Sequence, residues 1–282
     1  MAAAVIAGML IHQHAGVEDV AKFGGPDFKL SGELDGPSGE PISAVGFSPD
    51  GRMLALGDMV GTISVWNVAS RQMTSTVSDP TIARIYSMAF SPDGRTMAVG
   101  DGNGTTYLWN VTSMTLSAQL ANRGCDRVSS VAFNANGRSL LIACGEGSVY
   151  QWQTATRPAT ATLLTREAEA VALAFTFGGS RMAGVDEAGQ IYLIDTATGQ
   201  TMPVHFDLPT DSFDSIAFSA DGRTLGGGTT HGRVCLWSLS GHLIATRTDP
   251  DSSGVRSVAF SPDGHTIAAG DSIGSTYLWK AG

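Results

Sequence analysis

Three short segments contain residue types at spacings that could do chemistry. Gly270 to Gly274 reads GDSIG and matches the Gly-x-Ser-x-Gly pattern that carries the nucleophilic serine of many hydrolases. Asp249 to Gly254 (DPDSSG) begins like a calcium-binding loop, and Gly226 to Gly228 is glycine-rich, as phosphate-binding loops are. These chemistries need particular neighbours: a strand-to-helix elbow with a separate base, a glutamate at the end of the calcium loop, and a helix N-terminus.

The elements that would position these segments follow an internal repeat of 42 or 43 residues. A phenylalanine recurs with this period, at Phe47, Phe90, Phe133, Phe175, Phe218 and Phe260. Nineteen residues after each phenylalanine stands a tryptophan or, once, an isoleucine, at Trp66, Trp109, Trp152, Ile194, Trp237 and Trp279. Five residues before this tryptophan slot there is always a glycine, where we expect a turn with positive φ. A period of this length indicates a repeat fold.

Each repeat predicts four short strands. Alternating apolar residues lead to Phe47, the turn sequence Ser48 to Gly51 follows, and a small apolar strand (54–57) comes next. A third strand ends at Trp66, and a half-polar fourth strand runs from Met73 to Val77. The residue before each phenylalanine is glycine or alanine, which suits innermost strands that crowd around an axis. Four antiparallel strands per repeat make one propeller blade, so we predict an all-β propeller.

The repeats resemble WD40 repeats of the bacterial type. The phrases SVAFSPDG at Ser257 to Gly264 and GSTYLW at Gly274 to Trp279 carry this resemblance, which extends over residues 41–282. Such repeats occur alone or attached to membrane-anchored serine/threonine kinases, but this chain has no kinase signature. The resemblance implies a non-enzymatic scaffold that binds proteins. The Gly-His dipeptide of the family and its Asp before the turn glycine are absent, so we expect packing to hold the tryptophans.

The ends of the chain predict six blades. The last repeat stops after its third strand at Trp279, and Phe28 to Leu34 occupy the place of a fourth strand. Pairing of the two ends would close a propeller over residues 28–282, with residues 1–27 as an N-terminal tail. Seven blades would need three more strands from residues 1–27, which are too few.

The N-terminal residues leave the location open. The apolar run Ala2 to Ile11 is too short to span a bilayer, so we expect no transmembrane span in this chain. The run is either a tail or the end of a longer hydrophobic segment. The first alternative places the propeller in the cytoplasm, and the second displays it outside the membrane.

The position of the three motifs within the repeat argues against a chemical role for them. The residues equivalent to Ser272 in other repeats are Met59 and Gly102, so this position belongs to a turn. No helix pattern follows Gly228, and a calcium loop that starts at Asp249 would place Phe260 where a glutamate is needed. We therefore expect no catalytic residue, no metal and no cofactor.

Composition excludes further classes. The chain has 26 acidic and 17 basic residues, a net charge of -9 and no run of Lys and Arg, whereas nucleic-acid binders present a basic face. The cysteines Cys125, Cys144 and Cys235 have no zinc-site spacing, and we interpret them as buried thiols. We expect a monomer with no nucleic-acid partner.

The predicted loops of one rim, which we call the top, carry most of the acidic residues. Four of these, Asp58, Asp101, Asp186 and Asp271, share the position eight residues before the tryptophan slot. Each could cap its own turn, and together they could form a negative rim that attracts a basic peptide; the two interpretations are compatible. Reversal of all four charges to lysine is then expected to weaken partner capture and to leave the fold intact.

A second candidate patch lies at the top of the predicted channel, four to six residues before the phenylalanines. Its residues differ between blades and include Arg84, Tyr86, Arg127, Asp214 and Arg256. We predict a protein-binding scaffold whose protein or peptide ligand lies on the acidic top rim. The alternative is a propeller enzyme or a small-molecule or metal sensor that uses the central channel, which would need convergent carboxylates or histidines there.

Overall fold

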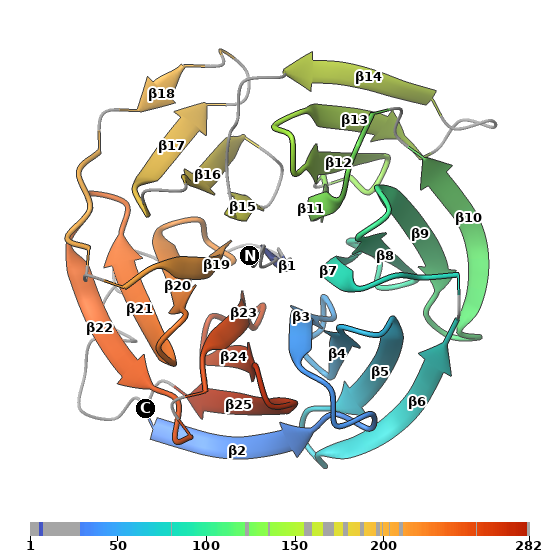
Figure 1. Cartoon of the computed structure of the whole chain (residues 1–282), viewed down its shortest axis with the longest axis horizontal. Coiled ribbons are helices and arrows are strands. Elements are labelled where there is room, and N and C mark those ends of the chain that lie inside the picture. The colour runs from blue at the N-terminus through green and yellow to red at the C-terminus, as the bar shows by residue number, and fades with distance from the viewer. Residues whose placement is uncertain are drawn as a thin grey trace.

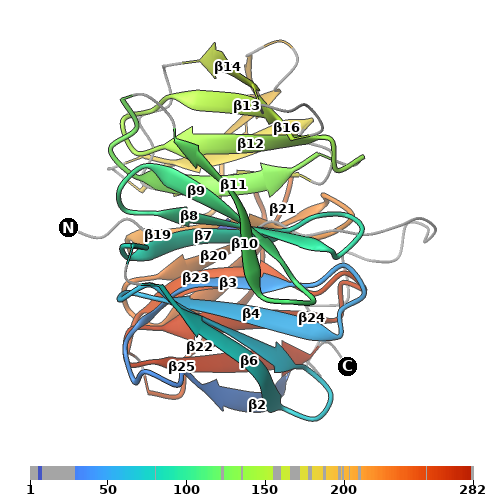
Figure 2. The same cartoon turned by 90° about the vertical axis from the view of Figure 1, so that its right-hand side faces the viewer.

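Six blades surround a central axis in the computed structural model of the chain (Figure 1). Seen from the side, the blades form a disc whose loops project from its two faces (Figure 2). The structure describes residues 6–7, 29–79, 81–121, 124–134, 136–154, 160–165, 172–176, 180–186, 189–195, 198, 200–202, 204–208, 211–251 and 253–280. Among these residues no helix is long and apolar enough to cross a bilayer.

Each of blades 1 to 5 contains four successive antiparallel strands, of which the first lies innermost, and blade 6 combines three successive strands with one from the other end of the chain (Figure 1). Blade 1 contains β3 (Ile42–Phe47), β4 (Met53–Asp58), β5 (Thr62–Asn67) and β6 (Gln72–Ser78). Blade 2 contains β7 (Ile85–Phe90), β8 (Thr96–Asp101), β9 (Thr105–Asn110) and β10 (Thr115–Ala121). Blade 3 contains β11 (Val128–Phe133), β12 (Ser139–Cys144), β13 (Val149–Gln153) and β14 (Thr160–Thr165).

The second half of the ring repeats this order. Blade 4 contains β15 (Ala172–Phe175), β16 (Arg181–Val185), β17 (Ile191–Asp195) and β18 (Thr201–Met202). Blade 5 contains β19 (Phe213–Phe218), β20 (Thr224–Thr229), β21 (Arg233–Ser238) and β22 (Leu243–Thr248). Blade 6 contains β23 (Val255–Phe260), β24 (Thr266–Asp271), β25 (Ser275–Lys280) and, from the other end of the chain, β2 (Lys29–Asp35).

The ring closes through the outermost strand of blade 6. β2 pairs antiparallel with β25, in a register that runs from Lys29 opposite Lys280 to Asp35 opposite Ser275. The six-blade prediction and the closing strand predicted at Phe28 to Leu34 are therefore confirmed. Because residues almost 250 positions apart share one sheet, the last blade is complete only when both ends of the chain are in place.

The repeated turn between the first two strands of a blade explains why the sequence forms hairpins there. In blade 1, Asp50 Oδ1 accepts hydrogen bonds from Ser48 Oγ at 2.7 Å and from the Arg52 N–H at 3.0 Å. Ser48 Oγ also accepts from the Met53 N–H at 2.9 Å, and Gly51 takes a φ of 69°. Blades 2, 5 and 6 repeat the Ser–Asp contact, so the turn is a property of this sequence motif.

The turn between the second and third strands also follows the prediction. The glycine five residues before the tryptophan slot has a positive φ in all six blades, at Gly61, Gly104, Gly147, Gly189, Gly232 and Gly274. At Gly61 a Cβ atom would also collide with the Ile82 carbonyl oxygen of the loop before blade 2. Glycine is needed there both for the backbone conformation and for the close approach of the next loop.

Neighbouring blades pack through glycines at the ends of second strands. A Cβ atom on Gly57 would lie 2.6 Å from Ile85 Cγ2 in blade 2, so the glycine makes room for that branched side chain. Gly100 makes room for Val128 in the same way, at the next boundary between blades. Buried hydrophobic clusters therefore extend across the boundary between blades 1 and 2 and across that between blades 2 and 3.

Two tryptophans are held by more than packing. Trp237 is fully buried, donates from Nε1 to the Asp207 carbonyl oxygen at 2.8 Å, and meets Phe213 edge to face. Trp66 Nε1 donates to Ser64 Oγ at 3.1 Å. The expectation that packing alone holds the tryptophans is wrong for these two, because neighbouring polar groups lie within reach. Trp109 Nε1, in contrast, is buried without a partner among the described residues.

A segment from the N-terminal region lies in the central channel. β1 (Ile6–Ala7) pairs in parallel with β11, with Ile6 opposite Ser130 and Ala7 opposite Val131. It is close to all six innermost strands, and Figure 1 places it on the axis. Residues 6–7 of the predicted N-terminal tail 1–27 thus contact the propeller, and the boundary between tail and propeller stays a prediction. The rest of the apolar run Ala2 to Ile11 lies outside the described residues.

Candidate functional site

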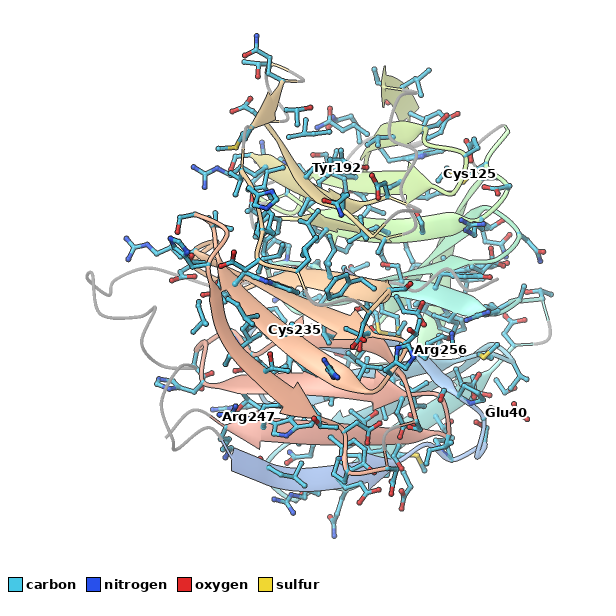
Figure 3. The ribbon with its side chains drawn as sticks, turned by 60° about the vertical axis from the view of Figure 1, so that its left-hand side comes forward. Glu40, Cys125, Tyr192, Cys235, Arg247 and Arg256 are labelled. Carbon is cyan, nitrogen blue, oxygen red and sulfur yellow. A yellow bond between two sulfur atoms is a disulfide. The ribbon has the colours of Figure 1, made fainter. Side chains whose placement is uncertain are left out.

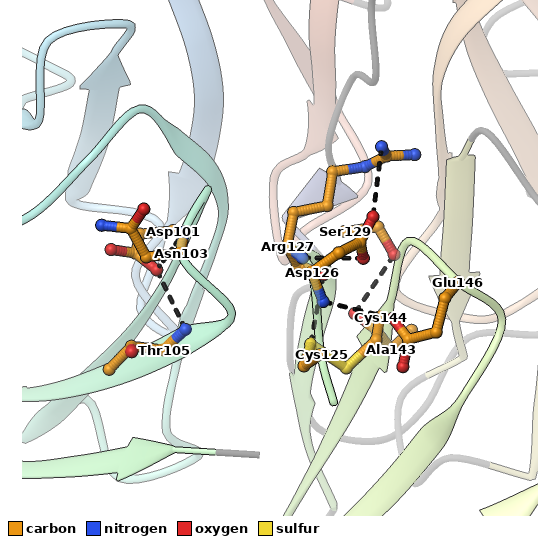
Figure 4. The surroundings of a disulfide bond; sticks show 10 residues. All are labelled: Asp101, Asn103, Thr105, Cys125, Asp126, Arg127, Ser129, Ala143, Cys144 and Glu146. Carbon is orange, nitrogen blue, oxygen red and sulfur yellow. Dashed lines mark hydrogen bonds and ion pairs between the residues drawn. A yellow bond between two sulfur atoms is a disulfide. The ribbon is translucent and has the colours of Figure 1, made fainter. Parts of the chain in front are cut away.

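The four aspartates predicted at the top rim cap the turns between second and third strands. Asp101 Oδ1 accepts hydrogen bonds from the N–H groups of Asn103 at 3.0 Å and Thr105 at 2.9 Å (Figure 4). Asp58 and Asp271 each make the same two bonds in their blades. Asp186 accepts from the Gln190 N–H at 2.8 Å. The turn-capping interpretation is thus what the geometry shows.

The second carboxylate oxygen joins the turn to the loop that enters the blade. Asp58 Oδ2 accepts from Ser38 Oγ at 2.6 Å, and Asp271 Oδ2 accepts from Ser253 Oγ at 3.0 Å. Asp58 is 2% exposed, whereas Asp101 and Asp271 are fully buried. A lysine could not replace these contacts, so we now expect reversal of all four charges to destabilise the turns as well as to change the charge of the rim.

Blade 3 uses a disulfide where these other blades use an aspartate. Cys144 occupies the position of Asp58 and bonds to Cys125 in the loop before blade 3, with 5.3 Å between the Cα atoms (Figure 4). The prediction of three free thiols is wrong for this pair, because the repeat brings the loop and the turn together. Cys235 remains a free, buried cysteine, and burial raises the pKa of its thiol.

Five of the innermost strands begin with a β-bulge. In β23, for example, Val255 pairs with Asp271 and Ser257 pairs with Gly270, so Arg256 between them has no partner residue. The equivalent extra residues of the other blades are Ser43, Tyr86, Ser129 and Asp214. A β-bulge changes the direction of a side chain relative to the alternation in a regular strand. In these five blades one residue near the upper end of the channel therefore has no partner residue in the second strand.

Four of the five residues predicted for the second patch come together there, and we call them the mouth cluster: Arg84, Tyr86, Asp214 and Arg256. Arg256 Nη1 donates to Asp214 Oδ2 at 3.0 Å, between blades 6 and 5. Arg84, just before β7 in blade 2, lies with its guanidinium 4.7 Å from the centre of the Tyr86 ring. These contacts form one pair between blades 6 and 5 and a second pair within blade 2, and the two pairs are close enough for their charges to interact.

The charges within the mouth cluster influence one another. Burial lowers the pKa of Arg84, with Tyr86 and Asp214 opposing that change and Arg256 adding to it. Burial also raises the pKa of Asp214, although the positive charges of Arg256 and Arg84 favour its ionised form. The Asp214 carboxylate therefore interacts with both guanidinium groups, through a hydrogen bond with Arg256 and through its charge with Arg84. Arg127, the fifth predicted residue, lies against Gly145 and within 3.8 Å of Asp126 in its own blade.

A group of exposed residues lies on the top face where blades 6 and 1 meet. The loop 36–41 passes between the two turns, because the Gly36 N–H donates to the Gly274 carbonyl at 2.8 Å and Ser38 bonds to Asp58. Val60 and Ile273, at the tips of these turns, are each 54% exposed. Asp35 and Glu40 at the ends of the loop are exposed as well, and Glu40 is labelled in Figure 3. Val60 and Ile273 directly precede the turn glycines Gly61 and Gly274, at the position where the WD40 pattern has an aspartate.

Three carboxylates gather on the top face of blade 6. One oxygen each of Asp249, Asp251 and Asp271 lies within 4.8 Å of the others. The single hydroxyl hydrogen of Ser253 lies between Asp249 and Asp271, with Oγ within hydrogen-bonding distance of both carboxylates, and the Tyr277 hydroxyl donates to Asp251. Because these side chains already serve as acceptors for protein donors, we assign no metal to the group.

The other chemical motifs lie in ordinary strands and turns. The Ser272 N–H donates to the Gly254 carbonyl at 3.0 Å, and β25 rather than a helix begins three residues later. Gly226 to Gly228 are buried within β20. The nucleophile elbow and the phosphate-binding loop therefore lack the helix that each requires.

Together the blades and their closure define a six-bladed β-propeller. The family profile described as "WD domain, G-beta repeat" matches residues 28–67, 73–110, 114–153 and 233–280, more than half of the chain. The chain therefore belongs to the WD40 repeat family. The bacterial type inferred from the sequence stays a prediction.

None of the curated proteins compared with the chain matches it. A solved structure, the β-propeller domain of Cps50 (Swd1) from Myceliophteria thermophila, is similar with a TM-score of 0.69 and 15% sequence identity. The match covers 90% of this chain and 100% of that domain. At this identity the likeness concerns the fold alone.

Proposed function

We propose that the chain is a non-enzymatic scaffold that binds a protein or peptide ligand on its top face. The observation that carries the proposal is the exposed group formed by Asp35, Glu40, Val60 and Ile273 at the boundary of blades 6 and 1. Two exposed apolar side chains beside two carboxylates suit a ligand that combines an apolar residue with basic neighbours. Membership of the WD40 family agrees with this role, because the family commonly serves as an interaction scaffold.

The acidic top rim contributes to this proposal in two ways. Asp58, Asp101, Asp186 and Asp271 organise the turns that present the exposed residues, and their charges add to the negative potential of the face. Exposed carboxylates such as Glu40 are free to meet a basic partner directly. Electrostatic attraction of this kind accelerates association more than it strengthens the final complex.

The opposite face offers fewer distinguishing features. Its hairpins repeat the same Ser–Asp turn in four blades, and the aspartates there are engaged by the turn. A surface built from repeated local contacts does not distinguish one blade from the next. The top face, where the residues differ between blades, is therefore the better candidate for a specific ligand.

Capture of partners from a lysate of the native host tests the proposal. Wild type is compared with the double variant Asp35→Lys/Glu40→Lys and with Arg52→Glu, a charge reversal on the opposite face whose side chain is 83% exposed. We expect a partner identified by mass spectrometry to be lost or strongly reduced only in the double variant. Equal capture by all three proteins, each folded by circular dichroism, would move the ligand away from this boundary.

The channel is the weaker candidate for a ligand site. Residues 6–7 lie within it, and the innermost strands around them are rich in Ala, Ser and Gly. These residues offer few of the convergent carboxylates or histidines on which a metal or small-molecule site depends. The proposal therefore places binding on the top face and not along the axis.

The disulfide is relevant to the cellular compartment in which the protein resides. Disulfides form and persist mainly in oxidising compartments. The Cys125–Cys144 bond thus favours display outside the cytoplasm over a cytoplasmic location, the two alternatives that the sequence leaves open. Alkylation of the protein as isolated from its host tests this, since a cytoplasmic protein would present both thiols in reduced form.

A further inference from the structure

The Arg84 guanidinium at the channel mouth has one complete hydrogen-bonding edge without a partner. Nε and Nη2 are both buried, and neither meets an acceptor among the described residues. These two nitrogens lie on the same side of the planar guanidinium, so their N–H groups point in nearly parallel directions. Buried donors are almost always satisfied in folded proteins, so a pair of buried donors without a partner is informative.

The surroundings of Arg84 hold that edge in place. The guanidinium lies over the Tyr86 ring with its Cζ atom 4.7 Å from the ring centre, and this contact restricts the orientation of the planar group. Tyr86 in turn packs against Gly102, where an added Cβ atom would lie 3.1 Å from Tyr86 Cε2. The bulge at the start of β7 sets the position of Tyr86. A rigid fork loses less freedom on binding than a mobile one.

The mouth cluster contains two arginines but only one carboxylate. Asp214 is hydrogen-bonded to Arg256. The negative charge of Asp214 attracts the Arg84 guanidinium, and the positive charge of Arg256 repels it. Arg256 Nε is also buried without a partner among the described residues. Two cations therefore share one carboxylate in a chain whose overall charge is negative. A second carboxylate near Arg84 would neutralise the group.

We propose that the free edge of Arg84 is a subsite for a carboxylate of the peptide ligand, supplied by an acidic side chain or by a C-terminus. Carboxylate oxygens match the two parallel N–H groups in bidentate geometry. The subsite lies at the upper end of the channel, because Arg84 directly precedes the innermost strand β7 and its charge interacts with those of Asp214 and Arg256 in blades 5 and 6. This proposal rests on the proposed function, because it requires a peptide ligand. It adds that the ligand has a carboxylate that binds Arg84.

Nuclear magnetic resonance of the arginine Nε–Hε groups tests the subsite with defined probes. The full chain, labelled with 15N, is titrated with acetyl-Gly-Glu-Gly-amide, with acetyl-Gly-Gly-Gly bearing a free C-terminus, and with acetyl-Gly-Gln-Gly-amide. We expect a saturable shift of the Arg84 signal with one or both carboxylate peptides and none with the glutamine peptide. The two carboxylate probes distinguish a side chain from a C-terminus as the source.

Variants assign the response to the free edge. Arg84→Gln is expected to weaken binding of the carboxylate probe at least tenfold, and Arg84→Lys to weaken it as well, because lysine has no planar fork. Arg52→Gln on the opposite face is the matched control and should bind as wild type does. If Arg84→Gln does not fold, Arg84→Lys decides the question.

Several outcomes would overturn the subsite. These are an equal response to the glutamine peptide, unchanged affinity in a folded Arg84 variant, or a response to inorganic phosphate without one to either carboxylate. The proposed function fails separately, when partner capture is unaffected by Asp35→Lys/Glu40→Lys. Loss of capture in that double variant without any carboxylate response would leave the scaffold role in place and remove only the anchor.

Discussion

Ser257 in the innermost strand of blade 6 accepts a hydrogen bond from the backbone N–H of Val45 in blade 1, at 3.1 Å. The two residues are 212 positions apart and meet where the ring closes. Apart from β11, which pairs with β1, the innermost strands have no neighbouring strand on their channel side among the described residues, so N–H groups on that side need other acceptors. Ser87 and Ser215 accept from the next blades in the same way, at 2.9 and 2.8 Å.

Replacing Ser257 with alanine should destabilise the ring at its seam. Val45 is fully buried, so loss of the serine hydroxyl leaves its N–H without this acceptor in a dry environment. A buried donor left unpaired costs about 1–3 kcal/mol of unfolding free energy. Urea unfolding followed by tryptophan fluorescence measures the change, with the exposed Ser212→Ala as the control. A Ser257→Ala midpoint equal to that of the control would mean that water or a shifted backbone satisfies Val45.

The sequence predicts the parts of the fold that repeat. Turn motifs such as Ser48 to Gly51 act locally, and the tryptophan slot recurs with a constant offset, so blade number and ring closure follow from counting. The positive φ of Gly61 and its equivalents follows in the same way, because one local conformation recurs six times. Even the closing strand near Lys29 is predictable, since the last repeat lacks its fourth strand.

Contacts between repeats are less accessible to sequence analysis. Cys144 holds the position of the capping aspartates, and this signal could have predicted a link to the preceding loop, but only knowledge of that loop's path brings in Cys125. Asp214 and Arg256 stand at one repeat position in adjacent blades, and their pairing depends on side-chain reach across the boundary. The position of Ile6 and Ala7 in the channel has no counterpart in the repeat.

Reduction of the Cys125–Cys144 bond should lower the stability of the propeller. The cysteines are 19 positions apart, and closing a loop of about this length stabilises a fold by about 3 kcal/mol through restriction of the unfolded chain. We expect one alkylated cysteine in the unfolded, unreduced protein and three after reduction. The urea midpoint of wild type should fall on reduction, while that of Cys125→Ser/Cys144→Ser should not change. Three reactive cysteines before reduction would contradict the bond.

Tyr192 should make the propeller less stable at high pH. Its hydroxyl is buried without a partner among the described residues. Burial, together with the negative charge of Asp186, raises the pKa of Tyr192 to about 12, from 10.0 for an ordinary tyrosine. Between these two values the unfolded chain loses the phenolic proton and the folded chain keeps it, so the unfolded state is favoured. The unfolding free energy should therefore fall as the pH rises from 10.0 toward about 12.

Tyr192→Phe isolates this contribution from those of other tyrosines, because Tyr107 and Tyr277 also have raised pKa values. At neutral pH the variant should be as stable as wild type or slightly more stable, since it removes an unpaired buried hydroxyl while keeping the ring. Above pH 10 its stability should fall less steeply than that of wild type. Tyrosinate absorbance in a pH titration gives the second measurement, as one late-ionising group should disappear. Parallel stability curves for the two proteins would show that Tyr192 ionises like a solvent-exposed tyrosine.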